Sequence, residues 1–331
     1  MSDKENNAVV VPHYDDLPLR GGARCSWGVW GADDKLGTLN NLTEARAQAA
    51  AATVKRGASF SLDWSMSYPN PPIFERGATE HIVTGFGDGN SQDDILNNWN
   101  TQATSQWDGF RHIRRRGHGV YNGLPDGEHG VHFWAERGIV GRGILADVAR
   151  YRESIGRPIA HGTPEPITVE ELEATFLWEG VTPQPGDILL VRTGWIGWYL
   201  GQTPERKTEL GTFVGLVTPG LDPSEAMARW LWDNHFASAA ADNPSLEIWP
   251  IGSHTDPVLL AEINADLTRD YEMLLHSRLL PMLGFPIGEL FALDTLAADC
   301  AEDGRYTFLL TSAVIPLQNG VGSPPNALAI K

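Results

Sequence analysis

Two side chains that can transfer protons lie four residues apart in the segment SQWDGFRH, residues 105–112. Asp108 supplies a carboxylate and His112 an imidazole, and both groups serve in general acid–base catalysis and in metal binding. The dipeptide Asp108-Gly109 is also a turn signal, so the two groups can equally belong to a hydrogen-bonded turn. The surrounding sequence is too rich in glycine for a long helix. A functional interpretation therefore requires partners from elsewhere in the chain.

A second candidate pair lies near the C-terminus, where His276 precedes Glu289 by thirteen residues. His276 falls on the apolar face of a helix predicted over 265–284, where a histidine can also be a satisfied core residue. Glu289 leads into the apolar sequence LFAL. A carboxylate that enters a buried segment needs a partner, because an unpaired buried charge is costly. A divalent cation between Asp108, His276 and Glu289 would supply one.

Helix and strand patterns alternate along the chain, which favours an α/β architecture. Strands are expected at 59–66, 143–149, 187–194, 236–243 and 306–315, and helices at 43–55, 167–180, 222–236 and 265–284. Thr168 and Glu171 predict a capping box, and Asp222 with Pro223 predicts another helix start. Residues 68–130 read mostly as a loop of functional importance, with GFGDG at 85–89 as a turn. Residues 1–42 are expected to form an N-terminal arm and loop, and residues 43–331 a single domain.

Composition restricts the partners of the protein. The net charge of −17 over 331 residues disfavours nucleic acid and acidic membrane surfaces. The two cysteines, Cys25 and Cys300, are far apart and indicate a reducing compartment. No signal peptide or membrane span is evident, so we expect a cytoplasmic enzyme acting on a small molecule. The common nucleotide, zinc-protease and α/β-hydrolase motifs do not occur.

Several separated segments, in order, resemble the cyclase family of metal-dependent hydrolases, which includes bacterial kynurenine formamidase and isatin hydrolase. These segments are WGVWGADDKLGTLNNLT, SQWDGFRH with YNG, GRGILADV, AADNPSLE, LLHSRLLPMLGFPIGEL and NGVGSPPNALAI. The resemblance implies a swivelling β/β/α single domain that assembles as a homodimer or homotetramer. It also implies hydrolysis of a C–N bond in an amide, N-formyl aromatic amine or lactam, with a possible place in tryptophan catabolism.

The family signature HxGTHxDxPxH departs from this sequence at two ligand positions. Its last histidine, a catalytic acid/base, falls on His112, and its aspartate falls on Asp108. Its two earlier histidines fall on Gln102 and Gln106, and its later His and Glu on His276 and Glu289. An amide oxygen binds hard cations but is a poor zinc ligand. The resemblance thus implies one divalent ion, manganese, magnesium or zinc, held by a single set of ligands: Gln106, Asp108, His276 and Glu289.

Substrate-binding residues are proposed from position alone. Trp107 lies inside the motif and is expected to stack on a planar substrate, although core packing also explains a tryptophan. Arg114 or Arg115 is expected to pair with a substrate carboxylate, although an arginine run is also typical of a solvated face. Two other functions remain open: a metal-free cyclase, lactonase or dehydratase that uses Asp108 and His112, and a non-catalytic protein that binds a small ligand.

Overall fold

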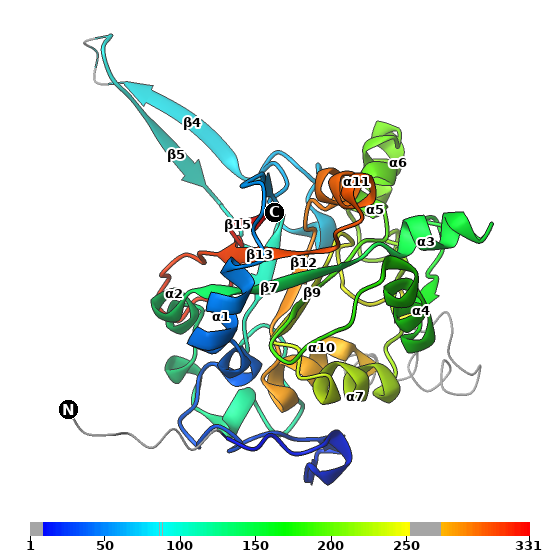
Figure 1. Cartoon of the computed structure of the whole chain (residues 1–331). Coiled ribbons are helices and arrows are strands. Elements are labelled where there is room, and N and C mark those ends of the chain that lie inside the picture. Colours follow the sequence, from blue (N-terminus) through cyan, green and yellow to red (C-terminus); the bar gives the residue numbers. More distant parts are fainter. Residues whose placement is uncertain (1–8, 86, 88, 252–272) are drawn as a thin grey trace.

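The computed structural model describes residues 9–85, 87, 89–251 and 273–331. Its centre is a nine-stranded mixed sheet with the strand order β14-β6-β12-β11-β9-β7-β13-β15-β3 (Figure 1). In chain order these strands are β3 (Ser59–Ser61), β6 (Gln106–Asp108), β7 (Ile139–Ala146), β9 (Ile188–Val191), β11 (Ser238–Ala241), β12 (Ile287–Glu289), β13 (Thr307–Ser312), β14 (Gly322–Ser323) and β15 (Ala327–Ile330). This arrangement confirms the expected α/β class.

The middle of the sheet is parallel and its two sides are antiparallel. Strands β7, β9, β11 and β12 run in the same direction, whereas β6 and β13 pair antiparallel with the outer members of that group. Every residue of β9 and β11 is buried, as expected of central strands covered on both faces. Because parallel strands end at the same edge, residues that follow β9, β11 and β12 gather there.

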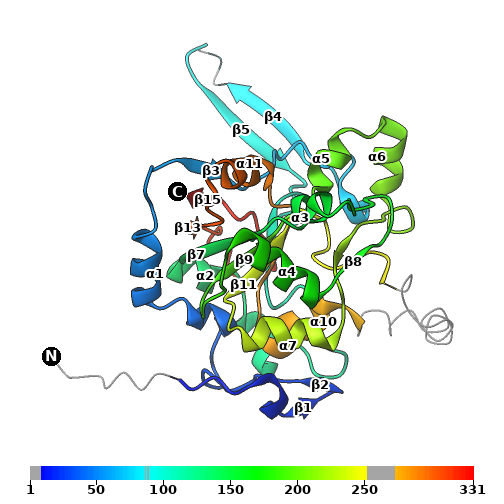
Figure 2. The ribbon, with the colours of Figure 1, turned by 45° about the vertical axis from the view of Figure 1, so that its right-hand side comes forward.

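Helices cover the sheet and close its ends. They are α1 (Glu44–Ala51), α2 (His132–Arg137), α3 (Val148–Ser154), α4 (Val169–Glu179), α5 (Trp195–Leu200), α6 (Pro204–Leu210), α7 (Glu225–Asp233), α10 (Leu275–Arg278) and α11 (Asp294–Asp303). Figure 2 shows α4 and α7 close together beside β9 and β11, and α4 contacts both α3 and α7. Within the described ranges, no helix has the length and apolar character that a bilayer crossing requires.

Shorter elements complete the chain. Single helical turns occur at η1 (Tyr14–Asp16), η2 (Gly37–Asn41), η3 (Ile73–Glu75), η4 (Tyr121–Gly123) and η5 (Asp126–Glu128), and η7 (Leu279–Leu283) is a π-helix. Three small sheets pair β1 (Leu19–Arg20) with β2 (Ala23–Arg24), β8 (Pro166–Ile167) with β10 (Gly220–Leu221), and β4 (Glu80–Gly85) with β5 (Gln92–Asn97). Figure 1 shows the β4–β5 hairpin projecting from the body.

The described part of the N-terminal segment, from residue 9 onward, is tied to the body at separate points. The backbone N–H of Tyr14 donates to Asp233 at the end of α7, and the backbone N–H of Ser26 donates to the carbonyl of Met282. Further along, the Thr38 hydroxyl donates to the carbonyl of Ala237. The expected boundary at residue 42 stays a prediction.

The N-caps of α4 and α7 show where a local sequence pattern predicted the start of a helix correctly and where it did not. The capping box of α4 is confirmed, because Thr168 accepts from the Glu171 N–H and the Glu171 side chain accepts from the Thr168 N–H. The expected N-cap of α7 is wrong: Ser224 caps the helix. Asp222 instead donates its backbone N–H to Ile167, so extended pairing continues through Asp222 and delays the helix.

Two other segments differ from the expectation. The region 68–130 holds the β4–β5 hairpin and the short strand β6 as well as loops. The turn expected at GFGDG, residues 85–89, lies partly outside the described residues, which do not include 86 and 88. The helix expected over 265–284 lies outside the described residues up to 272, and its remainder is α10 followed by η7. Gly284 ends this part in the left-handed conformation.

Candidate active site

Strand β6 presents two polar side chains on one face of the sheet. Gln106 and Asp108 are two residues apart, so they point to the same side, while Trp107 points to the other. Antiparallel pairing with β12 sets Gln106 opposite Glu289. The side chains of Gln106, Asp108 and Glu289 are buried. Three residues of strand therefore deliver two of the predicted ligands and align them with a third.

Trp107 belongs to the core, and its expected role as a stacking wall for substrate is wrong. Its ring is fully buried, its indole N–H donates to the Ser312 hydroxyl at 2.9 Å, and it packs edge-to-face with Phe291 at a centroid distance of 5.0 Å. The alternation of a β-strand turns it away from the polar side of β6.

The His276 ring lies at the centre of the polar cluster. Its Nε2 atom is 3.1 Å from Oε1 of Glu289 and 3.6 Å from Oδ2 of Asp108. Its Nδ1 atom is 2.8 Å from Oε2 of Glu247. Asp108, His112 and His276 each offer a ligand atom, and these three atoms lie within 4.8 Å of one another. The structure thus brings together residues from β6, β12, α10 and the loop after β11.

Gln102 connects the catalytic candidates. Its Nε2 lies 2.5 Å from Oδ1 of Asp108 and 2.8 Å from Nδ1 of His112. The Nε2 atom of His112 is 4.0 Å from Oδ1 of Asp108. The amide therefore orients the His112 ring.

Burial and mutual charge set the protonation of the cluster. Burial alone raises the pKa of Asp108, but His112, His276 and Arg76 outweigh it and lower that pKa to about 2. Burial and the Asp108 charge raise the pKa of Glu289 to about 7, against the opposing effect of His276. Burial lowers the pKa of His112, although Asp108 opposes this. At neutral pH, Asp108 is therefore ionised and His112 is neutral.

Glu247 is a site residue that sequence reasoning missed. Its buried carboxylate lies against Nδ1 of His276 through both oxygens, at 2.8 and 3.0 Å. Burial lowers the pKa of His276, but Glu247, Asp108 and Glu289 together raise it well above the ordinary value. A carboxylate on the second nitrogen of a histidine is the usual support of a metal-binding imidazole. The signals in the sequence were an acidic residue shortly after a buried strand and its place at the end of the AADNPSLE segment.

The donor set fits a divalent cation. Gln106 donates its amide N–H to Glu289, which leaves Oε1 of Gln106 buried without a hydrogen-bond donor. Oδ2 of Asp108 is also buried without one. Such atoms are costly unless a cation or proton meets them. Carboxylate and amide oxygens with one imidazole suit manganese or magnesium better than a structural zinc site.

A cavity of about 180 Å³ opens onto this cluster, with His112, Glu247, His276 and Glu289 in its polar wall. A cavity of this order accepts a single aromatic ring. The site is therefore open to a small molecule beside the catalytic candidates.

The opposite wall of the cavity is aromatic. Phe74 lies 5.2 Å from Phe213 and 5.2 Å from Trp249, measured between ring centroids. Phe74 has φ 59° and ψ 33°, a left-handed conformation that costs a bulky residue on the order of 1 kcal/mol. These three rings, rather than Trp107, can hold a planar substrate.

Arg114 and Arg115 are not among the described residues that line this cavity, and their expected role in binding substrate stays a prediction. Arg115 is buried, and its guanidinium donates to the carbonyl of Gly21, which anchors the N-terminal segment. Arg114 is exposed and does not line the cavity. The arginine on the cavity wall is Arg76, which no sequence pattern singled out.

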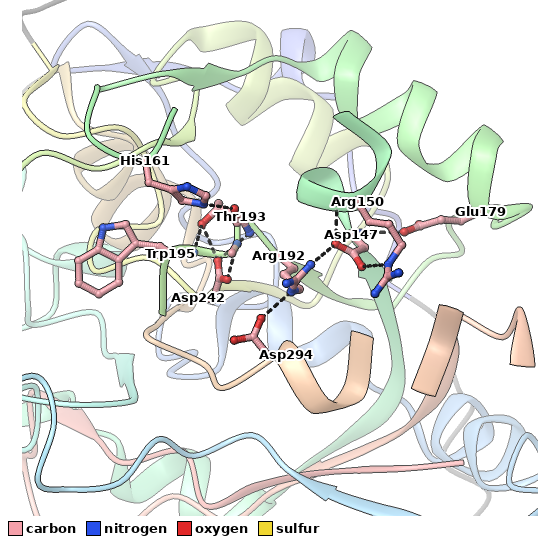
Figure 3. A network of polar contacts seen from close by, with 10 residues as sticks. Asp147, Arg150, His161, Glu179, Arg192, Thr193, Trp195, Asp242 and Asp294 are labelled. Carbon is pink, nitrogen blue, oxygen red and sulfur yellow. Dashed lines mark hydrogen bonds and ion pairs between the residues drawn. The ribbon is translucent and has the colours of Figure 1, made fainter. Parts of the chain in front are cut away.

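Asp242 and Asn243 follow β11 and were open to a binding or a turn role. Figure 3 shows Asp242 among polar side chains at the ends of neighbouring strands, where it accepts from the N–H groups of Thr193 and Gly194 at 2.7 Å. Nδ2 of Asn243 donates to the carbonyl of Pro219 at 2.8 Å. Both residues therefore organise the loops that start α5 and lead to Glu247.

Comparison with solved structures supports the fold. A crystal structure titled as a novel cyclase is 29% identical, with a TM-score of 0.73, and the match covers 93% of this chain and 99% of that chain. Isatin hydrolase A from Labrenzia aggregata, bound to benzyl benzoate, is 17% identical with a TM-score of 0.52, over 88% of this chain and 98% of that chain. An isatin hydrolase bound to the product analogue thioisatinate is 14% identical, with the same TM-score and coverage.

The sequence comparison agrees. No curated protein matches the chain. The Cyclase family model, described as "Putative cyclase", matches residues 44–248, a span that includes Asp108, His112 and Glu247. Because this match covers more than half of the chain, the protein belongs to the cyclase family.

Proposed function

We propose that this protein is a metal-dependent hydrolase that cleaves the C–N bond of a small aromatic amide, N-formyl aromatic amine or lactam. The observation that carries the proposal is the convergence of three buried carboxylates, Asp108, Glu247 and Glu289, on one buried imidazole at the wall of a cavity. A divalent cation would balance these carboxylates more fully than a protonated His276 alone. The folds of the isatin hydrolases agree with it.

Four side chains would hold the ion: Gln106 through Oε1, Asp108, His276 and Glu289. A divalent cation bound there polarises a carbonyl group and lowers the pKa of water. Glu247 holds the His276 ring in the orientation that presents Nε2 to the other ligands. His112 is also close enough to Asp108 and His276 to be a ligand. Its place on the cavity wall suits it to proton transfer instead.

His112 performs the acid–base chemistry in this proposal. Hydrolysis of an amide removes one proton from water and adds one to the leaving nitrogen. The neutral His112 ring takes the proton from water and returns it to that nitrogen. The rings of Phe74, Phe213 and Trp249 hold the substrate and exclude water from its aromatic part.

Metal content and turnover of the purified protein test the proposal. We expect one divalent ion per chain and activity that chelation abolishes. His112→Ala should retain the ion and lose roughly 10²- to 10⁴-fold in kcat on a panel of amides, lactams and N-formyl amines. His81→Ala, on the exposed β4–β5 hairpin, is the matched control and should leave kcat unchanged.

The same measurements separate the two other functions. Turnover of lactones or other substrates that is insensitive to chelators, without a bound ion, would favour the metal-free cyclase, lactonase or dehydratase. Ligand binding without turnover of any compound in the wild type would favour the non-catalytic protein. Either result would overturn the hydrolase proposal.

A further inference from the structure

We propose that Arg76 makes this cavity selective for aromatic substrates that carry a carboxylate on or beside the ring. The inference rests on the proposed function for the identity of the cleaved bond. Arg76 follows η3 directly, is half-buried and lines the cavity together with His112, His276 and Glu289. It is thus a cation on the wall of a site whose other polar groups are largely acidic.

The guanidinium of Arg76 has donors available for an anion. Its Nη1 donates to the carbonyl of Gln102, and its centre lies 5.3 Å from the centroid of the Phe74 ring. Among the described residues, no carboxylate lies within ion-pair distance of it, and its Nε–Nη2 edge makes no hydrogen bond. That edge has the fork geometry that binds a carboxylate through two parallel hydrogen bonds.

The backbone around Arg76 fixes the guanidinium relative to the aromatic wall. Phe74 and Glu75 both have positive φ values, 59° and 56°, and the Glu75 N–H donates to the carbonyl of Gly211. This tight turn places Phe74 and Arg76 on the same cavity. A ring held by Phe74 and Trp249 can therefore present a carboxylate substituent to Arg76 while its amide faces the ligand cluster.

Charge balance makes the anion acceptable. The carboxylates of Asp108, Glu247 and Glu289 are balanced by a divalent cation and Arg76 together. Without Arg76 the occupied site would keep a net negative charge and repel an anionic substrate.

A matched substrate pair tests the inference. 2-Formamidobenzoate and formanilide contain the same scissile bond and differ in the carboxylate. We expect the wild type to prefer 2-formamidobenzoate, and Arg76→Gln to raise the KM for it by about 10- to 100-fold, with a much smaller change for formanilide. Arg76→Lys should restore part of the preference, and Arg206→Gln on exposed α6 should change neither substrate.

A structural role predicts another pattern. Because Arg76 also holds the Gln102 carbonyl, loss of that support would lower kcat on both substrates by the same factor. Equal losses on the two substrates, or no wild-type preference, would overturn the inference. Gln at position 76 keeps an amide donor for Gln102, so a selective effect cannot come from that contact alone.

Ligand binding keeps the test independent of turnover. Calorimetry with benzoate and with benzamide measures the same discrimination if neither formamide is hydrolysed. Weaker binding of benzoate by Arg76→Gln, by at least 10-fold, with unchanged binding of benzamide would support the inference even if the proposed function failed. Equal affinity of the wild type for the two ligands, unaffected by the substitution, would overturn it.

Discussion

Glu247 and His276 are paired through both oxygens of one carboxylate, at 2.8 and 3.0 Å from Nδ1 of the ring. Both side chains are buried, and they come from the loop after β11 and from α10. The pair fixes which nitrogen of His276 faces Asp108 and Glu289. The orientation of a candidate ligand is therefore set by Glu247, the last residue of the AADNPSLE segment, to which the sequence analysis assigned no role.

Removing the charge of Glu247 should weaken metal binding. Glu247→Gln keeps the shape of the side chain but makes His276 a less basic and less firmly oriented ligand. We expect the metal dissociation constant to rise by roughly 10- to 100-fold, with activity recovered at high metal concentration. Titration of the metal-free protein by calorimetry measures this directly. Glu173→Gln on α4, which bonds Trp230, is the control, and unchanged affinity in Glu247→Gln would contradict the assignment.

Shortening Trp107 should affect stability rather than substrate binding. Trp107→Phe removes the hydrogen bond to Ser312 and leaves a void against Phe291. We expect the free energy of unfolding to fall by roughly 1–3 kcal/mol. Urea denaturation measures that loss, and KM should change equally for substrates of different size. A rise in KM for aromatic substrates only, at an unchanged free energy of unfolding, would show that Trp107 binds substrate.

The buried carboxyl of Glu179 should make the protein less stable as pH rises. Burial, together with the charge of Asp147, raises its pKa to about 9, although a hydrogen bond from the Asp147 N–H opposes this. The folded chain therefore retains a proton that the unfolded chain releases near pH 4.5. Stability that is fully present below about pH 4.5 is lost progressively as pH rises towards 9.

Glu179→Gln tests this pH dependence. Glutamine keeps an acceptor for the Asp147 N–H but has no proton to lose, so its unfolding free energy should fall less between pH 5 and pH 8 than that of the wild type. The difference is expected to be on the order of 1 kcal/mol per pH unit at most. Equal pH dependence in the two proteins would show that Glu179 ionises normally in the folded state.

Local signals predicted the regular elements near the site but not its walls. Thr168 with Glu171 marked the start of α4 because both partners of a capping box lie within one helical turn. Strand β6 escaped notice because three residues are too few to show a period. The strand that sets Glu289 opposite Gln106 is β12, about 180 residues further along, and no local pattern contains this pairing.

Residues could be assigned to the site from the sequence only where the family signature includes their positions. Asp108, His276, Glu289 and Gln106 were expected together, and the structure places them together, while their role as ligands stays a prediction. Phe74 and Arg76 lie in an irregular turn, and their relation to the site depends on tertiary packing against Gly211 and Gln102. For Trp107, proximity to the motif along the chain gave the wrong role, because its ring is buried in the core.

The alternation of side chains on β6 gives the site a safeguard against misfolding. A shift of this strand by a single residue against β12 would turn the Trp107 indole towards the polar cluster. It would also bury the Gln106 amide and the Asp108 carboxylate in the apolar core. Both changes are unfavourable, so the misaligned fold is less stable than the correct one. Correct pairing of β6 with β12 therefore also places Gln106 and Asp108 at the site. Chains that are folded around β6 but have these side chains misplaced should be rare.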